Sequence, residues 1–202
     1  RAAFDSADVS RASHGDRARL WAQLIVAHVR VNDVEGGIRA LQDLIGAGLR
    51  PPLSAVNSIL HGYARRGRAK PAYDLFGQLA RGAFEALQPD AMSWNALVLV
   101  HAVAHDPTAA EAAIASMKAA GIAPTRQTWT TLMNAYVESG MWTAAFAVYQ
   151  YLETNPDPTL RPDTPVANVM LKACLLTGTS GDKVLALMRE LVLRGVRPDM
   201  ST

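Results

Sequence analysis

The sequence predicts an all-α fold, an α-solenoid of about five helix-turn-helix repeats. Proline recurs at spacings of 35 to 38 residues, and each segment between prolines carries two apolar stripes with helical spacing, separated by residues typical of turns. The recurring prolines are Pro51, Pro89, Pro124, Pro162 and Pro198. A pair of short helices cannot bury its apolar faces alone, so neighbouring pairs are expected to stack.

The period divides most of the chain into five repeats. They are 18–52, 53–90, 91–125, 126–163 and 164–199. Residues 1–17 are expected to be an N-terminal segment or the remnant of a preceding repeat, and residues 200–202 the start of a further one. Because the first residue is Arg1 rather than Met, we expect the sequence to be an excerpt of a longer chain.

The first half of each repeat is predicted to be a helix, because apolar residues recur at i, i+3, i+4 and i+7. In chain order these stripes are Trp21, Leu24, Ile25, His28; Val56, Ile59, Leu60, Tyr63; Trp94, Leu97, Val98, His101; Trp129, Leu132, Met133, Tyr136; and Ala167, Met170, Leu171, Cys174. A turn signal follows each stripe. The turn signals are Asn32 and Asp33, Gly67, residues 105–107, Gly140 and residues 177–182.

The second half of each repeat has the same spacing and is predicted to be a second helix. Its stripes are Gly37, Ala40, Leu41, Leu44; Ala72, Leu75, Phe76, Leu79; Ala110, Ala113, Ile114, Met117; Ala145, Val148, Tyr149, Leu152; and Val184, Leu187, Met188, Leu191. Three of these helices are followed by Gly-x-x-Pro, where glycine can adopt the left-handed cap and proline prevents continuation. These endings start at Gly48, Gly121 and Gly195.

Composition excludes several classes of protein. Hydrophobic residues make up 50% of the chain, but no apolar run reaches the roughly 18 residues that a membrane span needs. One cysteine cannot form an internal disulfide framework, which fits a reducing compartment. The net charge is only +2, so binding to nucleic acid cannot rest on overall charge. Arginine outnumbers lysine 16 to 4, and its planar fork suits phosphate.

Two stretches of the sequence follow a known repeat pattern closely. They are TWTTLMNAYVESGMWTAAFAVYQYL in repeat 126–163 and SAVNSILHGYARRGRAKPAYDLFGQL in repeat 53–90. Both resemble pentatricopeptide repeats, organellar RNA-binding α-solenoids, with Gly140, Ala145, Tyr149 and Leu152 at the expected places. Tetratricopeptide repeats fit less well, because their period is 34 residues and their opening is Trp-x-x-Leu-Gly-x-x-Tyr. The resemblance covers residues 18–199 and implies a right-handed superhelix whose first helices line a concave groove.

The resemblance also implies where bases are recognised, mainly at the fifth and the last residue of each repeat. The fifth residues are Ala22, Asn57, Asn95, Thr130 and Asn168, and the last residues are Pro52, Asp90, Thr125, Asp163 and Asp199. From the residues themselves, a short amide or hydroxyl one position past the start of a buried stripe is expected to face out, and a nearby carboxylate can fix its orientation.

Each pair of fifth and last residues implies a base preference by the same resemblance. Asn57 with Asp90 and Asn168 with Asp199 are similar to uracil-recognising pairs, Thr130 with Asp163 to a guanine-recognising pair, and Asn95 with Thr125 to a loose pyrimidine pair. Ala22 with Pro52 has no polar group. The implied 5′ to 3′ string is any base, U, pyrimidine, G, U. An alternative stays open, in which the aspartates cap the next helix and their partners are neutral surface residues.

Contacts to the RNA backbone are expected from the arginines near the ends of first helices. They are Arg30, Arg65, Arg66 and Arg68. A solvated turn between helices also collects such charges, so a structural role for this cluster stays open. Basic residues occupy the end of the first helix in only two repeats, and the valine that the family usually has second in each repeat, as a wedge between bases, is absent. The residues in its place are Arg19, Ser54, Met92, Gln127 and Pro165.

The sequence therefore predicts an organellar protein, of mitochondrion or plastid, that binds single-stranded RNA or rRNA along its concave groove. The weakened groove favours a component of a larger ribonucleoprotein, such as an organellar ribosome or an RNA-processing or translation complex. The alternative is a scaffold for neighbouring proteins with little RNA contact. We predict no enzyme activity, cofactor, membrane span or small-molecule substrate. A metal is not expected either, because His101 and His105 are four apart but lack an adjacent glutamate and a third ligand.

Overall fold

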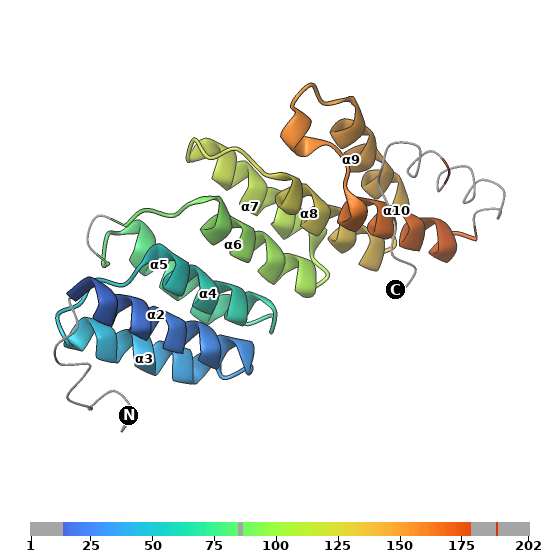
Figure 1. Ribbon diagram of the computed structural model, residues 1–202. Helices are drawn as coiled ribbons and strands as arrows, with labels where there is room; N and C mark the ends of the chain where they lie inside the picture. The colour runs from blue at the N-terminus through green and yellow to red at the C-terminus, as the bar shows by residue number, and fades with distance from the viewer. Residues whose placement is uncertain (1–13, 85–86, 179–188, 190–202) are drawn as a thin grey trace. The chain divides into compact units, whose positions relative to one another are not determined.

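The chain folds into short helices arranged in successive pairs (Figure 1). In this computed structural model residues 14–84, 87–178 and 189 are described. The helices are α2 (His14–Arg30), α3 (Val34–Gly46), α4 (Leu53–Ala64), α5 (Ala69–Ala80), α6 (Ala91–Val103), α7 (Pro107–Ala119), α8 (Arg126–Glu138), α9 (Trp142–Thr154) and α10 (Thr164–Leu176), with one 3-10 turn, η1 (Pro158–Leu160). No strand occurs within these ranges, and the predicted all-α class with paired helices is confirmed.

Two compact units divide the chain, residues 1–97 and 98–202, and their boundary falls inside α6. In the N-terminal unit, α2 packs against α3 and α4, and α4 packs against α5. In the C-terminal unit, α8 packs against α7, α9 and α10. First helices of successive repeats, such as α2 with α4 and α8 with α10, are therefore direct neighbours within each unit.

The turns that separate the paired helices lie where the sequence predicts them. Asn32 and His105 adopt positive φ angles of 66° and 55°, a conformation that asparagine and histidine tolerate better than most residues. The aspartate after each caps the next helix, since Asp33 Oδ1 accepts from Gly36 N at 2.8 Å and Asp106 Oδ1 accepts from Ala109 N at 2.9 Å.

The ends of the second helices also follow the prediction where they are described. Gly48 and Gly121 have φ of +71° and +77°, the left-handed cap expected of glycine at a helix end. Gly195, the second stripe of the last repeat and residues 200–202 lie outside the described residues. At the other end, α2 begins at His14, four residues before the expected start of the first repeat at Ala18. Asp16 lies in the first turn of this extension, where a negative charge favours a helix start.

The predicted stripes form the core of each unit. In the N-terminal unit, Ile59 and Leu60 of α4 are fully buried. In the C-terminal unit, Met133 of α8, Leu152 of α9 and Met170 of α10 belong to one buried cluster. Burying one large apolar side chain contributes about 1.5–3 kcal/mol, so these contacts between successive helices hold the repeats together. Within the described ranges, no helix has the length and apolar character to cross a membrane.

Candidate nucleic-acid interface

Asn57 and Asp90, the fifth and last residues of the second repeat, meet in the structure. Asn57 Nδ2 donates to Asp90 Oδ1 at 3.0 Å, although the two residues are 33 positions apart. Asn57 belongs to the buried side of α4, and Asp90 immediately precedes α6. The carboxylate therefore fixes the orientation of the amide.

The expectation that the fifth residues face outward is wrong for two of them. Asn57 is 2% exposed and Asn95 is 4% exposed, whereas Ala22, Thr130 and Asn168 are half-buried. The physical reason at Asn57 is that its amide bonds inward, to Asp90 and to the buried hydroxyl of Ser93. Only the edge of this amide remains for a ligand.

Thr130 and Asp163 are arranged differently from Asn57 and Asp90. Thr130 Oγ1 donates to the carbonyl oxygen of Arg126 at 2.8 Å, one helical turn back. Asp163 Oδ2 pairs instead with Arg126 Nε at 2.8 Å, and its Oδ1 accepts from Val166 N at 3.3 Å. The carboxylate of Asp163 therefore forms an ion pair with Arg126, the first residue of its own repeat, instead of accepting from the hydroxyl of Thr130.

Three of the four last residues that are described cap the next helix, whereas Pro52 makes no side-chain cap hydrogen bond. Asp90 Oδ1 accepts from Ser93 N at 2.9 Å, and Asp163 caps α10. Thr125 caps α8 in a reciprocal box with Thr128. Capping of the next helix and orientation of the fifth residue are therefore not exclusive, because Asp90 Oδ1 accepts from both Ser93 N and Asn57 Nδ2. Asp199 lies outside the described residues.

The four candidate backbone-contacting arginines divide into two pairs. Arg30 and Arg65 are exposed at the ends of α2 and α4. Arg66 donates from Nε to Asn32 Oδ1 at 2.9 Å and from its guanidinium to the Asn32 carbonyl, and Arg68 pairs with Glu35 at 2.5 Å. Arg66 and Arg68 thus connect the turn of the second repeat to that of the first, so the structural role suggested for this cluster applies to them.

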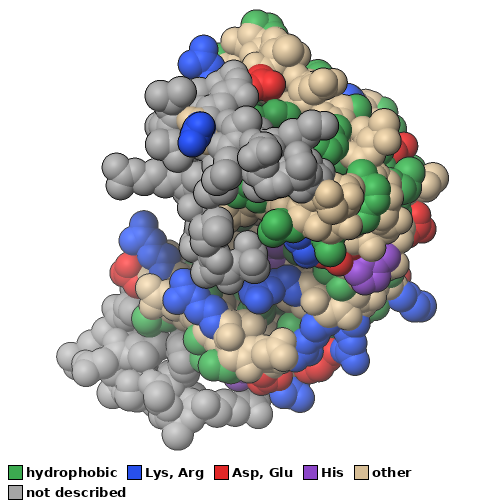
Figure 2. Space-filling view, turned by 90° about the vertical axis from the view of Figure 1, so that its right-hand side faces the viewer, with side chains coloured by type: hydrophobic (Ala, Val, Ile, Leu, Met, Phe, Trp, Pro, Cys, Tyr) green, Lys and Arg blue, Asp and Glu red, His purple; other side chains and the backbone are tan. Residues whose placement is uncertain are grey.

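Positive charge is concentrated in the N-terminal unit. Residues 1–97 contain 12 Lys and Arg against 9 Asp and Glu, net +3, whereas residues 98–202 contain 8 against 9, net −1. Figure 2 shows a face of the molecule on which several Lys and Arg side chains gather. In the C-terminal unit, Glu138 occupies the place corresponding to Arg30 and Arg65 and pairs with Lys172. An anionic ligand is therefore attracted mainly to the first repeats.

A surface hollow lies beside Arg30. It has a volume of about 370 Å³ and is lined by five residues of α2 and by Ser54 of α4. Ala22, Val26 and Arg30 stand one turn apart along α2 and face this hollow. The hollow therefore lies along the first helices of the first two repeats, with the Arg30 side chain in its wall.

His61 is a half-buried side chain of α4 whose pKa lies below its ordinary value of 6.5, first because burial disfavours the charged ring and then because Arg65 is positive. The unfolded chain therefore binds this proton more readily than the native state. Stability due to His61 is present above pH 6.5 and is lost as pH falls through the lowered pKa. We expect His61→Gln to reduce the dependence of the unfolding free energy on pH between 7 and 5, measured by urea unfolding. Equal pH dependence in both proteins would contradict this.

Sequence reasoning missed two residues of this region, Ser93 and Arg126. Ser93 had a local signal, since Asp90-x-x-Ser93 has the spacing of a capping box. Arg126 had none, because its ion pair with Asp163 joins residues 37 positions apart. Among the described residues, no group of three or more His, Cys, Asp or Glu side chains is placed to hold a metal ion.

Comparison with known proteins gives one consistent family. The model described as pentatricopeptide repeat domain matches residues 84–139, and the one described as PPR repeat matches residues 54–81 and 127–155. A chloroplastic pentatricopeptide repeat-containing protein of Arabidopsis thaliana is 26% identical over 194 residues, which are 95% of this chain and 24% of that protein. The chain thus spans about a quarter of the length of this relative.

Solved structures show the same fold. The pentatricopeptide repeat protein PPR10, in complex with an 18-nt psaJ RNA element, matches with a TM-score of 0.75 and 20% identity, over 90% of this chain and 26% of that one. The pentatricopeptide domain of Arabidopsis thaliana protein-only RNase P 1, in complex with tRNA, matches with a TM-score of 0.62 and 18% identity, over 91% of this chain and 93% of that one. The paired helices of this chain therefore resemble those of the PPR10 solenoid.

Proposed function

Because the chain is a pentatricopeptide repeat protein, we propose that it binds single-stranded RNA along its first helices and recognises bases through the fifth and last residues of its repeats. The observation that carries the proposal is the hydrogen bond of 3.0 Å from Asn57 to Asp90. It joins the two residues that the family resemblance singles out, and it holds the amide in one orientation. The solved complexes of PPR10 with RNA and of the RNase P domain with tRNA support the same ligand class.

The distribution of charge supports contact with the RNA backbone in the first two repeats. Arg30 and Arg65 are exposed at equivalent helix ends, and the hollow beside Arg30 is open. Since Arg66 and Arg68 are bound to the preceding turn, only Arg30 and Arg65 of the four candidates remain for phosphate. This supports a role as a component of a ribonucleoprotein in which other subunits share the binding. The chloroplastic relative supports an organellar location, mitochondrion or plastid.

The double variant Arg30→Ala/Arg65→Ala is expected to weaken RNA binding and its dependence on salt. Each phosphate contact to a single strand contributes about 0.7 to the slope of log K against log salt, so losing two lowers the slope by about 1.4. The slope is measured by fluorescence anisotropy at salt concentrations from about 50 to about 200 mM. The probe is a labelled single-stranded RNA that contains the string any base, U, pyrimidine, G, U between adenines.

The matched control is Arg66→Ala/Arg68→Ala, which removes the same charge from residues engaged with Asn32 and Glu35. We expect its salt slope to stay close to that of the unaltered protein. Equal losses of slope in both double variants would show that only net charge matters. If the unaltered protein binds no RNA at low salt, RNA binding itself is disproved.

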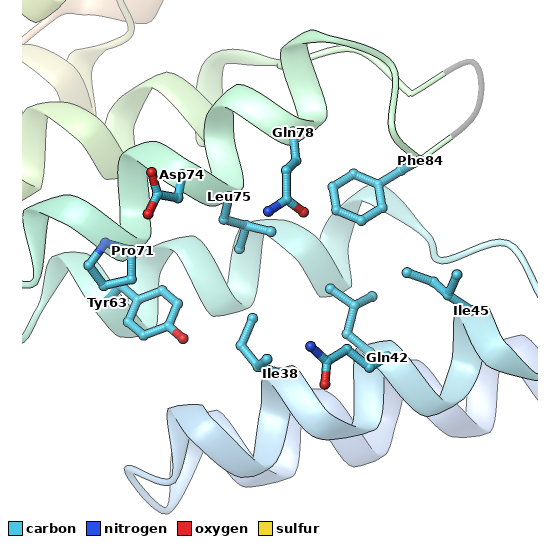
Figure 3. A pocket seen from close by; sticks show the side chains of 10 residues that line it. Ile38, Gln42, Ile45, Tyr63, Pro71, Asp74, Leu75, Gln78 and Phe84 are labelled. Atoms are coloured by element: carbon cyan, nitrogen blue, oxygen red, sulfur yellow. The ribbon is translucent and has the colours of Figure 1, made fainter.

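A protein-interaction scaffold is the second candidate, and one feature favours it. Between α3 and α5 lies a hollow of about 230 Å³, which Figure 3 shows from close by. Ile38 and Leu75 contribute apolar walls, and the amides of Gln42 and Gln78 lie on either side (Figure 3). A mixture of apolar and polar side chains is also found at interfaces between proteins. Absence of RNA binding by a correctly folded chain would favour this candidate.

A further inference from the structure

Three polar side chains from two successive repeats form a closed ring of contacts, two of which are side-chain hydrogen bonds. Asn57 Nδ2 donates to Asp90 Oδ1 at 3.0 Å, Ser93 Oγ donates to Asn57 Oδ1 at 2.7 Å, and Ser93 Oγ lies 3.1 Å from Asp90 Oδ1. Ser93 is completely buried, and Asn57 is 2% exposed. The third residue of one repeat thus contacts the fifth residue of the repeat before it.

The ring determines how the amide of Asn57 is held. A carboxylate only accepts hydrogen bonds, so the nitrogen of the amide must face Asp90, and the hydroxyl proton of Ser93 then goes to the amide oxygen. Both ends of the planar group are fixed, and the amide can neither flip nor swing. One N–H and one lone pair remain for a base, each in a set direction.

We propose that Ser93 is a positioning residue that maintains the base preference of the second repeat. The proposal rests on the RNA binding proposed above. Without the hydroxyl, the amide keeps a single hydrogen bond to Asp90 and turns about it, so its donor and acceptor no longer have fixed places. Discrimination between bases falls, while the contacts that hold the RNA backbone are unchanged.

Corresponding positions in the next two repeats show which side chains this place accepts. Thr128 and Val166 are the third residues of their repeats, and both are completely buried. Thr128 has a hydroxyl and bonds to Thr125, whereas Val166 has none and the neighbouring Asp163 pairs with Arg126. Threonine and valine have nearly the same shape, so exchanging them at residue 93 isolates the hydroxyl.

The experiment compares Ser93→Thr with Ser93→Val. Four labelled RNA probes differ only in the base at the second position of the string, and anisotropy gives an affinity ratio between the best base and the others. The unaltered protein and Ser93→Thr are expected to keep this ratio. Ser93→Val is expected to lower it about fivefold, the value of one net hydrogen bond. An unchanged ratio in Ser93→Val overturns the positioning role and leaves RNA binding intact.

Two further measurements separate the possible causes. In the RNA-free protein, the side-chain amide protons of Asn57 are expected to exchange slowly with solvent in the unaltered protein and in Ser93→Thr, and faster in Ser93→Val, as followed by NMR. Asp106→Ala removes a cap of α7 that accepts from Ala109 N at 2.9 Å, and is expected to lower stability without changing the base ratio. If it changes the ratio as Ser93→Val does, general destabilisation explains the effect and the proposal fails. If the unaltered protein binds no RNA, the proposal falls together with the proposed function, whatever the NMR signals show.

Discussion

Met133→Ala is expected to lower the free energy of unfolding by about 2–5 kcal/mol, the range for truncating a large buried side chain. Met133 lies on α8 with no exposed surface. It packs in a cluster with Leu152 of α9 and with Val166 and Met170 of α10. The substitution therefore removes contacts within the fourth repeat and between the fourth and fifth. Urea unfolding followed by circular dichroism measures the loss.

Met141→Ala is the matched control for this prediction. Met141 is 45% exposed at the start of α9, and its truncation is expected to change the unfolding free energy by no more than about 0.5 kcal/mol. If both variants lost the same stability, the loss would come from removing a methionine side chain anywhere, and not from the contacts of Met133 between repeats.

The buried cluster around Met133 also explains why the stability of one repeat depends on its neighbour. In a stacked array, stability is approximately the sum of the stability of each repeat and of the interfaces between neighbours. The cluster around Met133 contains residues of α8, α9 and α10, together with Leu160 of η1. A substitution that weakens this cluster is therefore expected to lower the stability of both the fourth and the fifth repeat.

The helices and turns could be predicted because each depends on residues close in sequence. The stripe from Val56 to Tyr63 predicts both the helix α4 and its buried face, and glycines such as Gly48 predict where a helix ends. These signals repeat in five segments of the chain, so an accidental match in one segment is corrected by the others. The repeat period does not predict the start of the first helix, since nothing in the sequence opposes the extension of α2 back to His14.

The candidate site could be predicted only in part, because it depends on contacts between repeats. The pattern marks Asn57 as one residue past a buried stripe, which suggests an outward direction, but the hydroxyl of Ser93 and the carboxylate of Asp90 draw its amide inward. The ion pair of Arg126 with Asp163 likewise depends on how two side chains meet across a repeat. Helical periodicity predicts neither the hydrogen bonds of Asn57 nor the ion pair of Arg126.

Exchanging the fifth residues of two repeats is expected to exchange their base preferences. By the family resemblance, Asn57→Thr gives the second repeat the combination of Thr130 with Asp163, and its preference should change from uracil to guanine. Thr130→Asn should change the fourth repeat from guanine to uracil. Each change replaces about one net hydrogen bond, so the preference should move by roughly three- to tenfold. Anisotropy with RNA probes that vary one base at a time measures both positions.

The surroundings of the two residues make this exchange a demanding test. Asn57 is held by Asp90 and Ser93, whereas Thr130 bonds to its own helix and Asp163 pairs with Arg126. Each single variant serves as the control for the other, because the preference at the unaltered repeat should stay unchanged. If Asn57→Thr lowers affinity for all four bases equally, Asn57 supports the packing of α4 and does not select a base. A change of preference at the second position alone would instead show that an amide with so little exposed surface still contacts the RNA.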